Sequence, residues 1–382
     1  MRGPDQPRAG DSMYQILFRI PLPGFENGMA VNGFGLMLLC AFLAGNWLIV
    51  RLARREGVDS GMLQDLALWT FLGGIAGGRA LYMWENTAEW KDFFGKFLLL
   101  NQGGLILYGG YAGGIVGMLL GWWVRHRDKP FNPLRVLDVY AAPAALGVAF
   151  GRVGCLMNGC CYGQVVPEDA PTLPMHYPLP AAARFDLTGK GMQTAAGFAL
   201  DPSRYPQAVV LATEPGAGAD ALRRGDLILK AQGRDIPTVG ELSSLLLGDW
   251  GTDPFRGVAR LDLFVMRDGV ETPVSIRPVT PGLQPAQLYE VISMVLLCLA
   301  MIAYLPVRSR MGQAAALFFL LYGCHRFLNE LLRNDPRPIG LENNVSVFLV
   351  LGGALVWGAC ALIGQRVRAH GDMPGTDPVA VG

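Results

Sequence analysis

Charged residues are scarce in this chain. They make up 16% of its 382 residues, whereas hydrophobic residues make up 51%. Soluble domains carry about 25% charged residues, so this composition favours a polytopic membrane protein. The formal net charge of +1 gives no basic excess, and nucleic acid is therefore not an expected partner. Residues 1–12 are polar and no short apolar stretch with a small-residue cleavage site follows, so no cleavable signal peptide is predicted.

Histidine is also rare. The four histidines are His126, His176, His325 and His370. None of them forms the His-Glu-x-x-His motif, which excludes the intramembrane metalloproteases that need it. No Gly-x-Ser motif suits a rhomboid-type serine protease. The seven cysteines are scattered apart from one group at 155–161, so they do not predict a disulfide framework.

Seven apolar stretches of roughly 20 residues have the length that crosses a hydrocarbon core. They lie near residues 29–50, 64–84, 105–124, 136–156, 286–305, 312–331 and 344–364. Every second short loop is basic, with Arg54 and Arg55 after the first stretch and Arg308 and Arg310 after the fifth. Basic loops face the cytoplasm by the positive-inside rule. The predicted N-terminus is therefore periplasmic and the predicted C-terminus cytoplasmic.

Glycines recur on one predicted helix face in the third stretch, where Gly109, Gly113, Gly117 and Gly121 are four residues apart. The second stretch contains the similar run GGIAGG at 73–78. Small residues let two helix backbones approach closely in a membrane. These glycines therefore predict helix-packing seams.

The long segment between the fourth and fifth stretches is expected to fold on the periplasmic side. Residues 203–280 resemble a PDZ domain, with a strand, a short helix and a second strand followed by an amphipathic helix. A hairpin then turns at Asp268-Gly269. PDZ domains bind extended peptides at a sheet edge, so such a peptide is an expected partner. The predicted order is a membrane domain at 1–163, a linker at 164–202, the PDZ-like domain, and a second membrane part at 284–382.

Polar residues within and at the ends of the predicted spans share one depth, near the outer leaflet boundary. They are Arg79, Tyr108, Arg152, Asn158, Gln287, Glu290, Arg326, Glu330 and Arg333. A single arginine at a helix end usually snorkels to the headgroups, but a charge inside a span is costly, and a shared depth favours a functional site. The planar fork of arginine suits a phosphate. These residues alone predict a lipid-modifying enzyme or a lipid-binding protein.

Four motifs in order resemble those of the prolipoprotein diacylglyceryl transferase family. GRVGCLMNGCCYG at 151–163 is similar to the family's G-R-x-G-N-x-x-N-x-E-x-x-G, and QPAQLYE at 284–290 is similar to its H-P-x-Q-L-Y-E. YGCHRFLNELLR at 322–333 is similar to Y-G-x-x-R-x-x-x-E-x-x-R, and GGLILYGG at 103–110 is similar to G-G-L-x-x-H-G-G. The resemblance covers about 30–163 and 284–365.

The resemblance implies an all-α polytopic protein of the bacterial inner membrane, here with the small α+β PDZ-like insertion. It implies transfer of the diacylglyceryl group of phosphatidylglycerol to the lipobox cysteine of a prolipoprotein, without a cofactor. The catalytic residues are then Tyr108, Arg152, Glu290 and Arg326, with the arginines on the phosphate and Glu290 orienting one of them or moving a proton. The substrate-binding residues are Arg79, Asn158, Gly163, Gln287, Tyr289, Glu330 and Arg333.

The chain departs from the family pattern in the acid–base half of the site. Tyr108 and Gln284 each stand at a usual histidine, Phe34 at a usual tyrosine, Cys155 at an asparagine and Cys160 at a glutamate. Tyr108 has two open roles, as a phenolate base or as a hydrogen-bond donor to the leaving phosphate. The second is favoured, because a phenolate would compete with the phosphate for the arginines. A catalytically altered lipid- or lipoprotein-binding protein of the same fold is the alternative.

Three interpretations are open for Cys155, Cys160 and Cys161. They are small apolar filler around the site, a disulfide involving Cys160, or ligands of a metal. A metal would need a fourth ligand, and the chain has no pair of Cys-x-x-Cys motifs. Filler is therefore preferred and no metal is predicted.

Overall fold

A helix lies on each of the seven apolar stretches in the computed structural model. The structure describes residues 16–20, 29–86, 106–129, 131–167, 174–177, 181–247, 260–333 and 344–363. The helices are α1 (Gly33–Arg55), α2 (Ser60–Asn86), α4 (Leu107–Arg125), α5 (Pro133–Asn158), α8 (Ala286–Tyr304), α9 (Gln313–Glu330) and α10 (Asn344–Ile363). Within these ranges α1, α5 and the stretch Ala286–Val307 are long and apolar enough to cross a membrane by length and composition.

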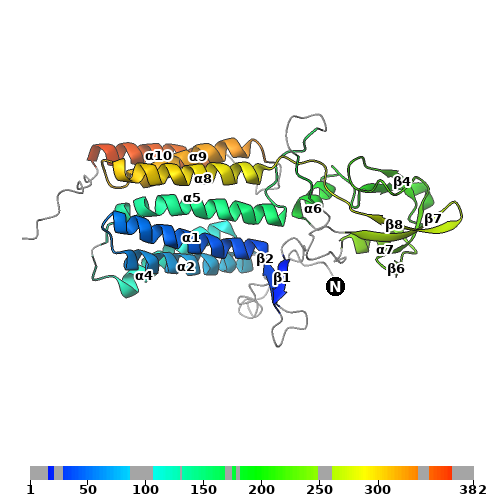
Figure 1. Ribbon diagram of the computed structural model, residues 1–382, viewed down its shortest axis with the longest axis horizontal. Helices are drawn as coiled ribbons and strands as arrows, with labels where there is room; N and C mark the ends of the chain where they lie inside the picture. The colour runs from blue at the N-terminus through cyan, green and yellow to red at the C-terminus, as the bar shows by residue number, and fades with distance from the viewer. Residues whose placement is uncertain are drawn as a thin grey trace, which may run out of the picture.

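The helices form one elongated bundle, and a β-rich unit lies beyond one end of it (Figure 1). Within the bundle, α5 packs against α1, α8 and α9. Leu63, Ala145 and Met294 are among the fully buried residues of this core. The first predicted span is wrong at its start, because Met29–Asn32 form strand β2, which pairs with β1 (Ile16–Ile20) before α1 begins.

The predicted glycine seams are confirmed as the contact between α2 and α4. A Cβ added to Gly113 would overlap the backbone oxygen of Gly73, and one added to Gly109 would overlap that of Gly77. Gly121 lies against the indole ring of Trp69. The two helices therefore pack at a separation that side chains larger than hydrogen would not allow.

The β-rich unit contains two small sheets. Strand β3 (Phe198–Leu200) pairs with β4 (Val210–Thr213), and the second sheet has the order β6 (Arg234–Asp235), β5 (Leu227–Ala231), β7 (Leu261–Arg267) and β8 (Val270–Ile276). The predicted hairpin is confirmed, with Asp268 and Gly269 at positive φ between β7 and β8. The amphipathic stretch forms α7 (Val239–Leu247).

The structure of this region differs from the expectation of a short helix between the first two strands. Turns, and not a helix, connect β4 to β5. The predicted linker segment 164–202 contains β3 and the short helix α6 (Ala182–Gly189). Because β3 pairs antiparallel with β4, the β-rich unit begins before residue 203.

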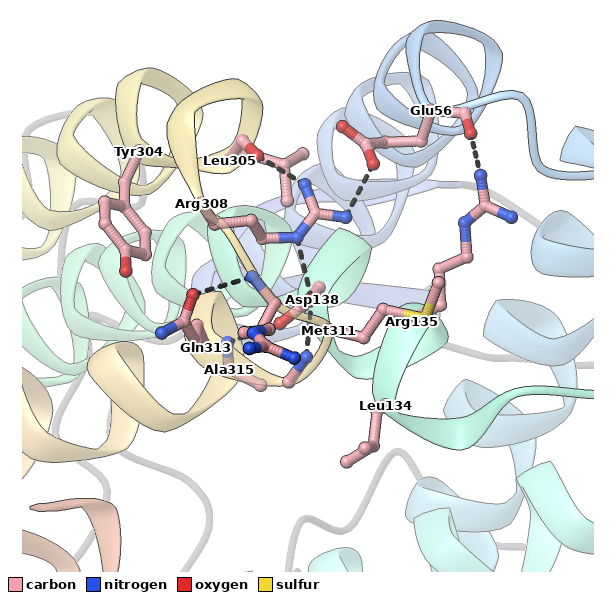
Figure 2. A network of polar contacts seen from close by, with 12 residues as sticks. Glu56, Leu134, Arg135, Asp138, Tyr304, Leu305, Arg308, Met311, Gln313 and Ala315 are labelled. Carbon is pink, nitrogen blue, oxygen red and sulfur yellow. Dashed lines mark hydrogen bonds and ion pairs between the residues drawn. The ribbon is translucent and has the colours of Figure 1, made fainter. Parts of the chain in front are cut away.

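A buried ion-pair network holds the other end of the bundle together (Figure 2). Arg308 follows α8, and its Nε lies 2.9 Å from Asp138 Oδ2 of α5. Its Nη2 lies 2.6 Å from Oε2 of Glu56, at the end of α1. Asp138 also accepts from the backbone N–H groups of Gly312 (2.8 Å) and Ala315 (3.0 Å), which begin α9. One carboxylate thus joins three helices and caps one of them. In the sequence, Arg308 is recognisable only as a charge in a basic loop.

Replacing Asp138 with alanine is expected to lower the free energy of unfolding by about 3–5 kcal/mol, because it leaves Arg308 buried with an incomplete set of acceptors. The measurement is denaturant or thermal unfolding of the purified protein in detergent. Lys129→Ala is the control, since its pair with Asp59 is about half exposed and should contribute less than about 1 kcal/mol. Equal losses in the two variants would contradict the role of the network.

Candidate functional site

The site lies at the end of the bundle that faces the β-rich unit. The C-terminal end of α5 and the N-terminal end of α8 meet there (Figure 1). Arg152 of α5 and Glu290 of α8 form an ion pair of 2.9 Å between Nε and Oε1, with side-chain exposures of 13% and 3%. A buried carboxylate needs such a partner, since burial of an unpaired charge costs several kcal/mol.

Helix α9 brings two more side chains to Glu290. Asn329 donates from Nδ2 to Oε2 at 2.7 Å, and His325 Nε2 lies 3.8 Å from Oε1. His325 and Asn329 are four residues apart and therefore share one helix face. The carboxylate is thus surrounded by a guanidinium, an amide and an imidazole from α5 and α9.

A second guanidinium, that of Arg326, lies on the same helix. Its Nε is buried, and the described residues offer it no hydrogen-bond acceptor. Tyr111 near the start of α4 interacts electrostatically with both Arg326 and Arg152. Tyr108, one turn earlier, is 47% exposed. The start of α4 therefore approaches the two arginines and brings two phenols to this end of the bundle.

Arg79 reaches this region from α2. It is 3% exposed, and its guanidinium lies 5.5 Å from the centre of the Tyr82 ring. The backbone N–H of Ile106 donates to the carbonyl of Gly78 at 3.1 Å. That bond places Arg79 in the part of α2 that packs against the start of α4.

The chain after α5 folds back over the site. Gly159 caps the helix in the left-handed conformation. Gln287 of α8 then donates from Nε2 to the Cys160 carbonyl at 2.7 Å and to the Tyr177 hydroxyl at 3.0 Å. Burial raises the pKa of Tyr177 to about 12, so this phenol stays protonated. Gln287 therefore holds the loop in place.

Gly163 ends this loop in an antiparallel bridge with Arg333, just beyond α9. Its backbone N–H donates to the carbonyl of Gln284 at 3.0 Å. A Cβ at Gly163 would lie 2.7 Å from the Cβ of Gln284. The glycine is thus required for close packing, and the bridge joins the loop to the ends of α8 and α9.

The structure brings Arg152, Glu290 and Arg326 together and places Glu330 and Arg333 on the following turn of α9 and just beyond it. Asn158 ends α5, and its buried Oδ1 accepts no hydrogen bond from the described residues. Tyr289 is 37% exposed on α8. Their predicted roles toward a substrate stay predictions.

Sequence reasoning missed His325, Asn329 and Tyr111. The first two occupy variable positions of the α9 motif, so the resemblance gave them no weight. Their spacing of four residues was the available signal, because it places them on one face of α9. Tyr111 stands in the glycine-rich stretch that was interpreted only as a packing seam.

The three clustered cysteines offer a further set of donor atoms. All seven cysteines of the chain fall in described ranges and carry free thiols. The Sγ atoms of Cys155, Cys160 and Cys161 lie within 4.8 Å of one another. Each of the three side chains is partly buried.

Comparisons with known proteins give the chain its family. The model of the prolipoprotein diacylglyceryl transferase family matches residues 24–359. A relative from Rhodopirellula baltica named phosphatidylglycerol–prolipoprotein diacylglyceryl transferase is 30% identical over 63% of this chain and 56% of its own length. A relative of the same name from Fusobacterium nucleatum is 33% identical over 36% of this chain and 46% of its own length. A relative from Clostridium perfringens, whose name carries the number 2, is 21% identical over 89% of this chain and 94% of its own length.

The match thus spans about half of the length of the Rhodopirellula and Fusobacterium relatives. The family model, in contrast, covers most of the present chain, including α1 through most of α10. The matched residues contain the Arg152–Glu290 pair, His325 and Arg326. The chain belongs to the prolipoprotein diacylglyceryl transferase family.

Proposed function

We propose that this chain transfers the diacylglyceryl group of phosphatidylglycerol to the lipobox cysteine thiol of prolipoproteins. The observation that carries the proposal is the pair of guanidiniums at one end of the bundle. Arg152 is held by Glu290, and Arg326 has a buried Nε–H that meets no acceptor among the described residues. A lipid phosphate supplies the oxygen atoms that such donors lack.

In the proposed reaction the thiolate sulfur attacks the glyceryl carbon that carries the phosphate. The C–S bond of the thioether forms while the C–O bond breaks, and glycerol 1-phosphate leaves with the electron pair. Arg152 and Arg326 stabilise the charge that develops on the leaving phosphate. Tyr108 donates a hydrogen bond to it, and Arg79, Arg333 and Glu330 complete the polar surroundings.

The thiol proton goes to His325. Both oxygens of Glu290 already have partners, in Arg152 and Asn329, which makes this carboxylate a poor proton acceptor. His325 is the neighbouring imidazole, and histidine is the side chain that most often acts as a general base. Glu290 then acts by positioning Arg152 and by stabilising the imidazolium that forms.

All seven apolar helices span the bacterial inner membrane in this proposal, with the N-terminus in the periplasm and the C-terminus in the cytoplasm. The support is the alternation of basic and mixed loops in the sequence. Membrane parts at 1–163 and 284–382 then flank a periplasmic insertion. Its PDZ-like region at 203–280 binds an extended segment of the prolipoprotein at a sheet edge, and β6 and β8 are the edge strands of the larger sheet.

Arg152→Ala and Arg326→Ala are each expected to slow transfer by about 10²–10³-fold, the loss that follows removal of one oxyanion donor. Lysine at either position should restore little activity, because it lacks the planar fork. The assay uses purified protein, phosphatidylglycerol labelled in its acyl chains and a lipobox peptide, with a serine peptide as the blank. Arg54→Ala, in the last turn of α1 and away from the site, is the control. Near-normal transfer in both site variants would refute the assignment.

His325→Gln is expected to lower the rate by about 10²–10⁴-fold, the usual contribution of a general base. A general base makes the rate of transfer depend on pH, and this dependence should disappear in the variant. Tyr108→Phe is the matched comparison, since loss of a hydrogen-bond donor should cost about 10²-fold and leave the pH–rate profile in place. A profile that moves in Tyr108→Phe and persists in His325→Gln would exchange the two roles.

A further inference from the structure

The cysteine group beside Arg152 has a geometry that neither a packing role nor the transfer reaction requires. Cys155 lies in the last turn of α5, and the chain turns back at Gly159 so that the backbone N–H of Cys160 donates to the carbonyl of Cys155 at 3.2 Å. Cys161 follows at φ +60°, a left-handed conformation that non-glycine residues seldom adopt. These turns bring three thiols together, with all Sγ atoms within 4.8 Å of one another.

That separation fits a thiolate metal centre. Zinc–sulfur bonds are about 2.3 Å long, which puts the sulfur atoms of a tetrahedral site about 3.8 Å apart. Small rotations about the Cα–Cβ bonds would bring the three thiols to this spacing. Asn158, whose side chain contacts Cys160, has a buried Oδ1 without a partner among the described residues. Because the amide of Asn158 faces Cys160, rotation of that amide by 180° would turn this oxygen toward the thiols, for the fourth position of a tetrahedral ion.

The surrounding charges favour thiolates. Arg152 precedes Cys155 by three residues and so lies on the same face of α5. Both Arg152 and Arg333 interact electrostatically with Cys161. Two guanidiniums offset the negative charge that three thiolates would bring into a partly buried place. Both guanidiniums also interact electrostatically with Glu290.

We propose that Cys155, Cys160 and Cys161 bind a thiophilic d¹⁰ cation, Zn²⁺ or Cu⁺. Soft thiolate ligands select these ions over the hard cations that carboxylates bind. Zn²⁺ takes the three sulfurs and one oxygen, whereas Cu⁺ takes the three sulfurs alone. The thiols release their protons to solvent when the ion binds. The occupied centre is anionic, with one net negative charge for Zn²⁺ and two for Cu⁺.

An anionic centre this close to Arg152 competes with a lipid phosphate for the same guanidinium. Loading the cysteines is therefore expected to weaken the binding of phosphatidylglycerol. The consequence rests on the proposed function, whereas the metal site itself does not. The two are separable, because metal binding is measured without substrate.

The experiment titrates the purified, reduced full-length protein with Co²⁺, Zn²⁺ and Cu⁺. We expect one equivalent per chain and, with Co²⁺, the near-ultraviolet charge-transfer absorption of cobalt–thiolate bonds, displaced by Zn²⁺. Serine at any of the three positions should weaken binding at least about 100-fold, since even an outer-shell partner is worth 10–100-fold. Cys40→Ser, in α1, is the control and should bind as the wild type does. Circular dichroism checks that every variant keeps its helices.

The proposal is overturned if the charge-transfer band is absent, or if the triple serine variant binds metal as well as the control. It is also overturned if the protein isolated without reductant is lighter by two hydrogens and has lost two alkylatable thiols of this group, which would make it a disulfide. Loss of transfer activity in the serine variants with unchanged metal binding would count against the metal site and leave the proposed function standing.

Discussion

The ion pair between Arg152 and Glu290 is the interaction on which the arrangement of the site depends. It joins α5 to α8 inside a largely apolar bundle, where burial of either charge without the other would cost several kcal/mol. The pair also fixes the guanidinium of Arg152 in one place. An unpaired arginine at a helix end would be flexible. The remaining polar groups at this end of the bundle are arranged around it.

The same helix is anchored at its other end by Asp138 and Arg308. Asp138 and Arg152 are 14 residues apart on α5, or about 21 Å at 1.5 Å per residue. A buried charge pair thus lies at each end of the apolar core. One pair joins α5 to α8, and the other joins α5 to Arg308, which follows the short turn after α8. The first pair faces the candidate site, whereas the second binds helix ends together and caps α9.

These contacts also decide which groups are available for chemistry. Glu290 is occupied by Arg152 and Asn329, so its value lies in holding and stabilising its neighbours. His325 keeps an imidazole within 3.8 Å of that carboxylate. Tyr108 and Gln284 stand where the motif resemblance in the sequence predicts histidines, and His325 supplies an imidazole to the site from α9.

The sequence predicted the elements that depend on local pattern. Apolar stretches of about 20 residues located the seven helices, glycines four apart located the seam between α2 and α4, and Asp268-Gly269 located a hairpin. The contacts that depend on tertiary packing could not be predicted in the same way. Asp138 and Arg308 are far apart in sequence and each looks like an ordinary helix-end charge.

His325 illustrates the same limit at the site. It stands at a variable position of the motif, directly before Arg326, and its partner Glu290 lies on another helix. The strand β3 was missed because three residues carry too little alternation to be recognised. Pairing with β4, which begins ten residues after β3 ends, is what makes it a strand.

In the proposed site, Glu290 acts on the phosphate through Arg152. A double-mutant cycle on the affinity for phosphatidylglycerol in mixed micelles tests it most directly, using Arg152→Ala, Glu290→Gln and the double variant. We expect Glu290→Gln to weaken binding when Arg152 is present and to add nothing when Arg152 is absent, a coupling of about 1.4 kcal/mol or more. Losses that simply multiply in the double variant would contradict it.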